Sequence, residues 1–251
     1  DTKNYTYPEL TNEININCGG LATGTALYSD KVDFSKNTIV YEVKSKALYE
    51  KVPFVLGMME EIMYNTRFDD YKRLKEIIAR IKSRLEASLM GQGHSIAMLE
   101  CCAQFSESAY YSDILRGYKY YEFIKKLDEE FEQNKTQIVD KLNKLVGYIF
   151  NKDNVIVSLT ADDEGYDCFV KALSAKSCNI KDEHYNTAVR SFIPVNVKTG
   201  YTSASQVQYV ARCGNFVKDG YKYTGALKVL KVIFSYDYLW INVRVKGGAY
   251  G

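Results

Sequence analysis

The sequence contains few of the residues from which most metal and acid–base sites are built. It has two histidines, His94 and His184, in 251 residues, which is too few for most such constellations. Glu183-His184 matches the last pair of an H-x-x-E-H zinc-ligand motif, but Ile180 stands where the first histidine should be. We therefore predict no metal site in this chain, and we interpret His94 as a residue at a helix start.

A dominant charge and a long apolar run are also missing. The net charge is +2, and basic residues alternate with acidic ones, so we expect no nucleic-acid partner. No apolar run approaches the ~18–20 residues that span a bilayer, so we expect no membrane partner. The start, Asp1 to Asn4, does not resemble a signal peptide and lacks an initiator methionine. We expect a cytoplasmic protein, or an organellar-matrix protein if the source is eukaryotic, and we interpret both ends as cuts through a longer protein.

Glycine-rich and cysteine-containing stretches give no cofactor site. The glycine-rich pieces at 18–20, 91–93 and 247–248 lack the Lys-Ser/Thr of a phosphate loop, so we interpret them as turns. The irregular spacing of the cysteines, in a chain long enough to bury a core, does not indicate a disulfide framework. We expect reduced, mostly buried thiols. The six cysteines are Cys18, Cys101, Cys102, Cys168, Cys178 and Cys213.

Hydrophobic periodicity predicts more helix than strand. The helices are expected at 8–17, 49–66, 69–90, 95–105, 120–131, 136–150, 166–173 and 223–240. The strands are expected at 21–28, 38–43, 154–160, 191–197 and 206–212. Because helical patterns dominate the middle and strands bracket them, the fold class is α+β, with an antiparallel sheet plus helices.

The polar stretch 174–186 is the candidate linker between two domains. We predict an α+β unit rich in long helices at 1–178 and the first part of a second α+β unit at 179–251. The second is too short to copy the first, and we expect both units to be truncated.

The C-terminal residues carry the candidate chemistry. Arg244 and Tyr250 flank the Gly247-Gly248 turn directly after an apolar helical stretch. Both side chains can donate hydrogen bonds to a developing oxyanion, and glycines allow a peptide to approach closely. In an arbitrary protein, such a pair across a turn is more commonly a pair of surface residues, and the spacing alone does not decide between these interpretations.

A long, ordered resemblance does decide. The runs QYVARCGNF (208–216), GYKYTGALKVL (220–230) and YLWINVRVKGGAYG (238–251) closely resemble the C-terminal half of the pitrilysin/insulysin-type (inverzincin) zinc metallopeptidases, in the presequence-protease and falcilysin branch. More loosely, the glycines at 19–20, the strand near 39–41 and the long helices between 49 and 90 are similar to that family's third domain.

The resemblance implies the architecture and the site. In that family, four homologous α+β domains form two halves that close around a peptide chamber. The first domain holds zinc and the general base, and the fourth donates an Arg and a Tyr. By motif position, these are Arg244 and Tyr250, with Gly247, Gly248 and Ala249 beside the substrate. The zinc ligands of the parent protein are then not in this chain, which by itself binds no zinc.

The resemblance also implies the function. The chain is expected to be a C-terminal-half fragment of a zinc metalloendopeptidase, inactive alone, whose partners are the N-terminal half of the same protease and peptide substrates. Open sheet edges and exposed apolar surface would favour self-association. The alternative is a non-catalytic, peptidase-like subunit that binds peptides or scaffolds an active partner. A third interpretation is a free-standing α+β binding domain with a chance match.

Overall fold

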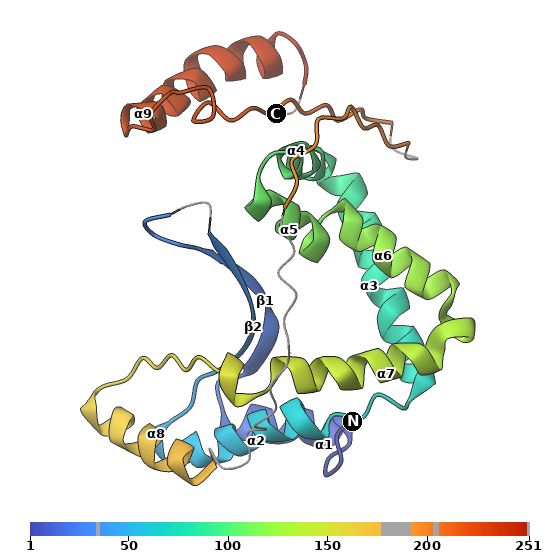
Figure 1. The fold of residues 1–251 in the computed structure, drawn as a ribbon, viewed down its shortest axis with the longest axis vertical. Coiled ribbons are helices and arrows are strands. Elements are labelled where there is room, and N and C mark those ends of the chain that lie inside the picture. Colours follow the sequence, from blue (N-terminus) through green and yellow to red (C-terminus); the bar gives the residue numbers. More distant parts are fainter. Residues whose placement is uncertain (34–35, 177–191, 203–205, 250–251) are drawn as a thin grey trace. The chain divides into compact units, whose positions relative to one another are not determined.

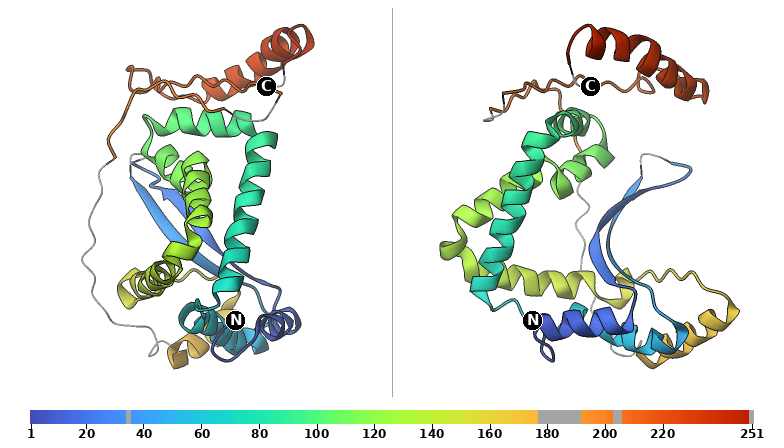
Figure 2. Two further views of the ribbon diagram at one scale, coloured as in Figure 1. Left: turned by 90° about the vertical axis from the view of Figure 1, so that its right-hand side faces the viewer. Right: turned by 180° about the vertical axis from the view of Figure 1, so that it is seen from behind.

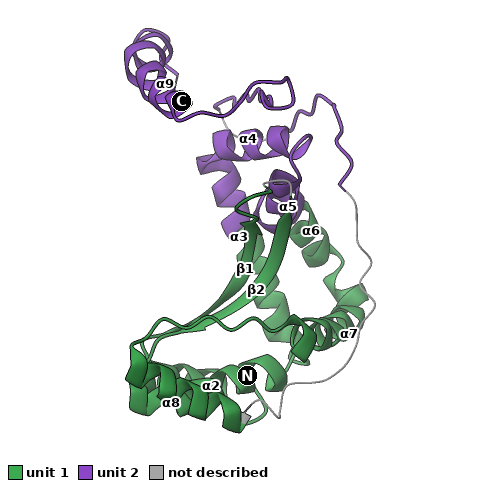
Figure 3. Ribbon diagram, turned by 60° about the vertical axis from the view of Figure 1, so that its left-hand side comes forward, with its two compact units in different colours: residues 1–83, 122–191 green, residues 84–121, 192–251 purple. Residues whose placement is uncertain are grey.

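The computed structural model describes residues 1–33, 36–176, 192–202 and 206–249 (Figure 1). The chain forms two compact units, coloured separately in Figure 3. Unit 1 comprises Asp1–Ser83 and Glu122–Ser191, and unit 2 comprises Arg84–Tyr121 and Phe192–Gly251. The predicted domain boundary at 178/179 lies outside the described residues, so that division stays a prediction.

Unit 1 begins with a helix and a hairpin. Helix α1 (Tyr7–Asn17) has Pro8 in its first turn, and the Thr6 N–H donates to the Glu9 carboxylate (2.9 Å), which satisfies one of the free amides at a helix start. Strands β1 (Leu21–Ser29) and β2 (Asn37–Ser45) then pair antiparallel, with Leu21 opposite Ser45. They form a long, twisted ribbon (Figure 1, Figure 2).

Helices complete unit 1. They are η1 (Tyr49–Lys51), α2 (Val52–Asn65), the first part of α3 (Tyr71–Gly91), the rest of α6 (Tyr118–Glu129), α7 (Phe131–Ile149), η2 (Lys152–Asn154) and α8 (Asp163–Lys176). Helix α2 packs against α8 and α1. The buried apolar side chains are Val55, Met58, Ile78, Ile124, Phe131, Ile138 and Ala172. Phe150 makes edge-on ring contacts with Tyr41 of β2 and Tyr64 of α2, which joins the hairpin to this helical core.

Unit 2 contains the end of α3, α4 (Gly93–Ala103), α5 (Glu107–Arg116) and the start of α6. Helices α4 and α5 pack together. Residues 192–202 and 206–225 are irregular, with a turn at 216–220. Helix α9 (Ala226–Ile233) continues directly into η4 (Phe234–Val245), which is a wider π-helix.

The α+β class is confirmed, since helices accompany a two-stranded antiparallel sheet. The hairpin and most helices lie where the sequence predicts them. The strand predictions at 154–160 and 206–212 are wrong, as is the described part of 191–197, because these residues pair with no strand in the described ranges. Ile156, for example, is 85% exposed. Helix α5 was not predicted, and the helix expected at 223–240 begins at Ala226 and reaches Val245.

Candidate functional site

Arg244 lies in the last turn of η4, and its side chain is exposed. Its guanidinium carbon is 4.7 Å from the centroid of the Trp240 ring, one turn earlier. Residues four apart share a helix face, and such a contact contributes about 0.5–1 kcal/mol at an exposed site. The helix therefore restrains the guanidinium group along its own surface.

The Gly247-Gly248 turn ends this helix. Gly248 has φ +69°, and its N–H donates to the Arg244 carbonyl (3.0 Å), while the Ala249 N–H donates to the Val243 carbonyl (3.1 Å). A Cβ on Gly247 would lie 2.6 Å from the Val243 oxygen. A left-handed glycine is a common way to satisfy the last carbonyls of a helix. The turn thus accounts for both glycines without a substrate.

The structure brings Arg244 together with Gly247, Gly248 and Ala249 in one turn. Tyr250 lies outside the described residues, so the distance between its hydroxyl and the Arg244 guanidinium is not part of this geometry. The catalytic roles of Arg244 and Tyr250, and contact of the other three residues with substrate, stay predictions.

Metal-ligating side chains do not converge in the described part of the chain. His94 lies in the first turn of α4, as predicted, with its ring centroid 6.2 Å from that of Tyr209. His184 is outside the described residues. Within residues 1–33, 36–176, 192–202 and 206–249, no group of three or more His, Cys, Asp or Glu side chains is placed to hold a metal ion.

Two shallow hollows lie in unit 1, and neither is lined by a predicted site residue. The larger, about 530 Å³, is lined by residues of α3 and α7, including Tyr71, Lys75 and Glu132. The smaller, about 310 Å³, lies between the N-terminal residues and α2 and includes Tyr5 and Glu61. Among the described helices, none is both long and apolar enough to cross a membrane.

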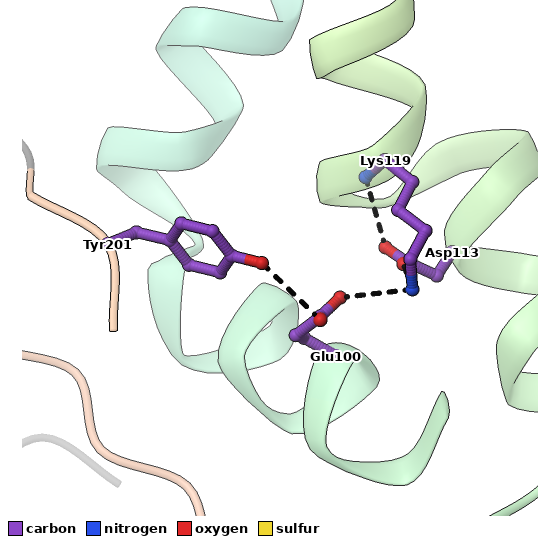
Figure 4. Close-up of polar contacts among 4 residues, drawn as sticks. All are labelled: Glu100, Asp113, Lys119 and Tyr201. Carbon is purple, nitrogen blue, oxygen red and sulfur yellow. Dashed lines mark hydrogen bonds and ion pairs between the residues drawn. The ribbon is translucent and has the colours of Figure 1, made fainter. Parts of the chain in front are cut away.

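A charged cluster that the sequence analysis missed lies in unit 2 (Figure 4). The Asp113 side chain on α5 is fully buried, and its carboxylate is 2.8 Å from the Lys119 ammonium on α6. The same ammonium lies 3.6 Å from the Glu100 carboxylate on α4. The Tyr201 hydroxyl donates to the other Glu100 oxygen (3.3 Å). One cation therefore faces two carboxylates, and the cluster connects three helices with the segment at 201.

The electrostatics of this cluster follow from burial. Desolvation, together with the neighbouring Asp113, raises the pKa of Glu100, because both oppose a second negative charge. Burial lowers the pKa of Lys119, but the two carboxylates outweigh it and the net direction is upward. No sequence motif could have revealed this cluster, because its members come from four separate segments.

Comparison with known proteins places this geometry in a family. Residues 1–127 match the family model for the associated domain of the M16 peptidases, subfamily C, and residues 200–251 match "PreP C-terminal domain". The chain belongs to the presequence-protease branch of this peptidase family. The resemblance inferred from the C-terminal runs is thereby confirmed, and Arg244 falls within the second matched segment.

Relatives in this family align over the whole length of the chain. It is 36% identical to "Protein HypA" of Clostridium perfringens, of which it covers 26%. It is 26% identical to "Presequence protease 1, chloroplastic/mitochondrial" of Arabidopsis thaliana, covering 23%, and 27% identical to "Presequence protease, mitochondrial" of Drosophila melanogaster, covering 24%. The chain thus spans about a quarter of the length of these curated relatives.

Proposed function

We propose that this chain is the C-terminal-half segment of a zinc metalloendopeptidase that degrades peptides in a closed chamber. In this proposal it supplies chamber wall and hydrogen-bond donors for the transition state. The observation that carries the proposal is the pair of family matches at 1–127 and 200–251. Relatives named presequence proteases, aligned over the whole chain, support it.

Arg244 and Tyr250 are the proposed donors. Attack on a peptide carbonyl produces a negatively charged oxygen, which a guanidinium and a phenol hydroxyl can stabilise if they are held in place beforehand. The contact with Trp240 and the turn at Gly248 restrain Arg244 at the helix end. Arginine remains charged throughout the physiological pH range, so this donor would not depend on a neighbouring base.

Zinc and the general base are proposed to belong to the N-terminal half of the same protease. The described residues do not fit a zinc site, as shown above, so no step is assigned to zinc within this chain. We expect the 251 residues alone to bind no catalytic zinc and to cleave no peptide. Several relatives are named mitochondrial or chloroplastic, and a cytoplasmic or organellar-matrix location for this chain is a proposal that cell fractionation would test.

The test uses the complete gene product. Arg244→Ala and Tyr250→Phe are each expected to lower the turnover of a quenched fluorescent peptide by about 10²–10³-fold, with zinc content unchanged. Lys246→Ala is the matched control, since Lys246 is an exposed cation in the same turn. Wild-type turnover in both the Arg244 and the Tyr250 variants would remove the proposed roles.

The gene upstream of Asp1 offers a simpler check. An in-frame H-x-x-E-H motif would support the enzyme, whereas a degenerate motif would favour the non-catalytic, peptide-binding or scaffold subunit.

A further inference from the structure

The segment from Tyr209 to Lys218 follows helix α4 within unit 2. The Tyr209 hydroxyl donates to the Met90 carbonyl (3.1 Å), and the Lys218 ammonium donates to the Phe105 carbonyl (3.2 Å). Between them, the Cys213 thiol lies 3.8 Å from the Met98 carbonyl. These contacts occur in the same order along both segments, so the position of Cys213 on the helix is fixed on both sides.

This position places Cys213 beside two other thiols. Met98, Cys101 and Cys102 share one face of α4, since residues three and four apart are neighbours on a helix. The Met98 carbonyl points along the helix axis toward the N–H of Cys102, so a sulfur atom next to that oxygen lies at the same turn as both cysteines. The Cys213 thiol makes side-chain hydrogen-bond contacts with Cys101 and Cys102. All three are free and only partly buried.

We propose that Cys213 forms a disulfide bond with Cys101 or Cys102 when the protein meets a low-molecular-weight disulfide such as oxidised glutathione. One cysteine thiolate attacks the small disulfide and releases one glutathione thiol. The second cysteine thiolate then attacks the mixed disulfide and releases another. Two protein thiols are thereby oxidised to one disulfide, and one small disulfide is reduced to two thiols.

Proximity drives this reaction. Burial raises the pKa of the Cys101 and Cys213 thiols, which leaves less thiolate at neutral pH and makes neither an activated nucleophile. The second step is nevertheless intramolecular, which favours it over attack by a thiol from solution. The resulting bond would tie the segment 209–218 covalently to α4.

Tryptic mapping tests this directly on the complete gene product. The native protein is incubated with oxidised glutathione, its free thiols are alkylated, and it is digested without reduction. Trypsin yields one peptide, 85–116, with both Cys101 and Cys102, and another, 213–218, with Cys213. We expect these two peptides to be joined, and to separate on reduction.

Variants identify the bond. Cys213→Ser and the double variant Cys101→Ser/Cys102→Ser should each abolish the joined peptide, and the two single variants show which cysteine is the partner. Cys168→Ser, in α8 of unit 1, is the control and should retain it. Far-UV circular dichroism shows whether each variant is folded. Recovery of Cys213 only as a glutathione adduct, an alkylated thiol or a bond between two copies of the chain would overturn the proposal, as would a bond only between Cys101 and Cys102.

Discussion

Replacing Lys119 with methionine would remove the only cation drawn in the cluster of Figure 4. The Asp113 carboxylate would lose its partner at 2.8 Å while its side chain stays fully buried. It would then face Glu100, whose side chain is 12% exposed, with no positive charge between them. Methionine matches lysine closely in helix propensity, so the substitution tests the charge rather than the helix.

The exposure of Lys119 sets the expected magnitude. Breaking a fully buried ion pair costs about 3–5 kcal/mol, whereas an exposed pair contributes about 0–1 kcal/mol. The Lys119 side chain is 39% exposed, so water would partly replace it. We expect a loss of about 2 kcal/mol in the free energy of unfolding, which lies between these limits.

Urea unfolding followed by far-UV circular dichroism measures this loss. The matched control is Lys125→Met on the same helix, where the ammonium lies 3.9 Å from Glu129 and both side chains are about half exposed. The control should lose less than about 0.5 kcal/mol. Equal losses in the two variants would refute the assignment of the Lys119 effect to buried charge.

The pH dependence gives a second check on the same cluster. Glu100 has a raised pKa in the folded protein, so it opposes folding as the pH rises from its ordinary value through the folded value. Glu100→Gln should therefore stabilise the protein at neutral pH, and this gain should vanish as the pH falls below the ordinary carboxyl range. In the Lys119→Met background the gain should be larger, because Asp113 then has no cation. A gain that does not change with pH would contradict this account.

Three further predictions concern other parts of the chain. The buried Glu61 carboxylate accepts hydrogen bonds from Asn4 and Asn65, and these hydrogen bonds outweigh burial and lower its pKa. Glu61→Ala should therefore cost about 1–3 kcal/mol at neutral pH in urea unfolding, with the cost shrinking as acid protonates the wild-type carboxylate. Gly248→Ala, at φ +69°, should cost about 1 kcal/mol locally, seen as roughly fivefold faster amide exchange in η4 without a change in global stability. Because Val232 of α9 is exposed, light scattering should show self-association of the 251 residues, reduced by Val232→Lys; a monodisperse monomer at high concentration would contradict this.

The sequence predicted the elements whose pattern is local. In α3, apolar residues at Leu74, Ile78 and Ile81 repeat every three or four positions, and this period is enough to define a helix and the face it buries. The hairpin was predictable for a similar reason, because its two strands are separated by a short polar turn.

Elements that depend on distant partners were not predictable. The apolar run at 155–159 has strand-like composition, but a strand also needs a neighbour, and sequence composition does not identify one. Helix α5 was missed because its buried side chains include Ser112 and Asp113 rather than an apolar stripe. Burial of Asp113 is acceptable only because Lys119 approaches from the next helix, and no local pattern reports that contact.

The same distinction applies to the candidate site, and it decides which residues can test it. The helix-ending turn already explains Gly247 and Gly248, so loss of activity in their variants would not separate a substrate contact from a distorted turn. Arg244 is more informative, because Arg244→Lys keeps the positive charge and loses the planar, multiply donating guanidinium. If the proposed oxyanion role depends on that geometry, Arg244→Lys should be nearly as slow as Arg244→Ala in peptide cleavage. Recovery of most of the wild-type turnover by lysine would show that charge alone suffices, and would refute a role for the guanidinium geometry.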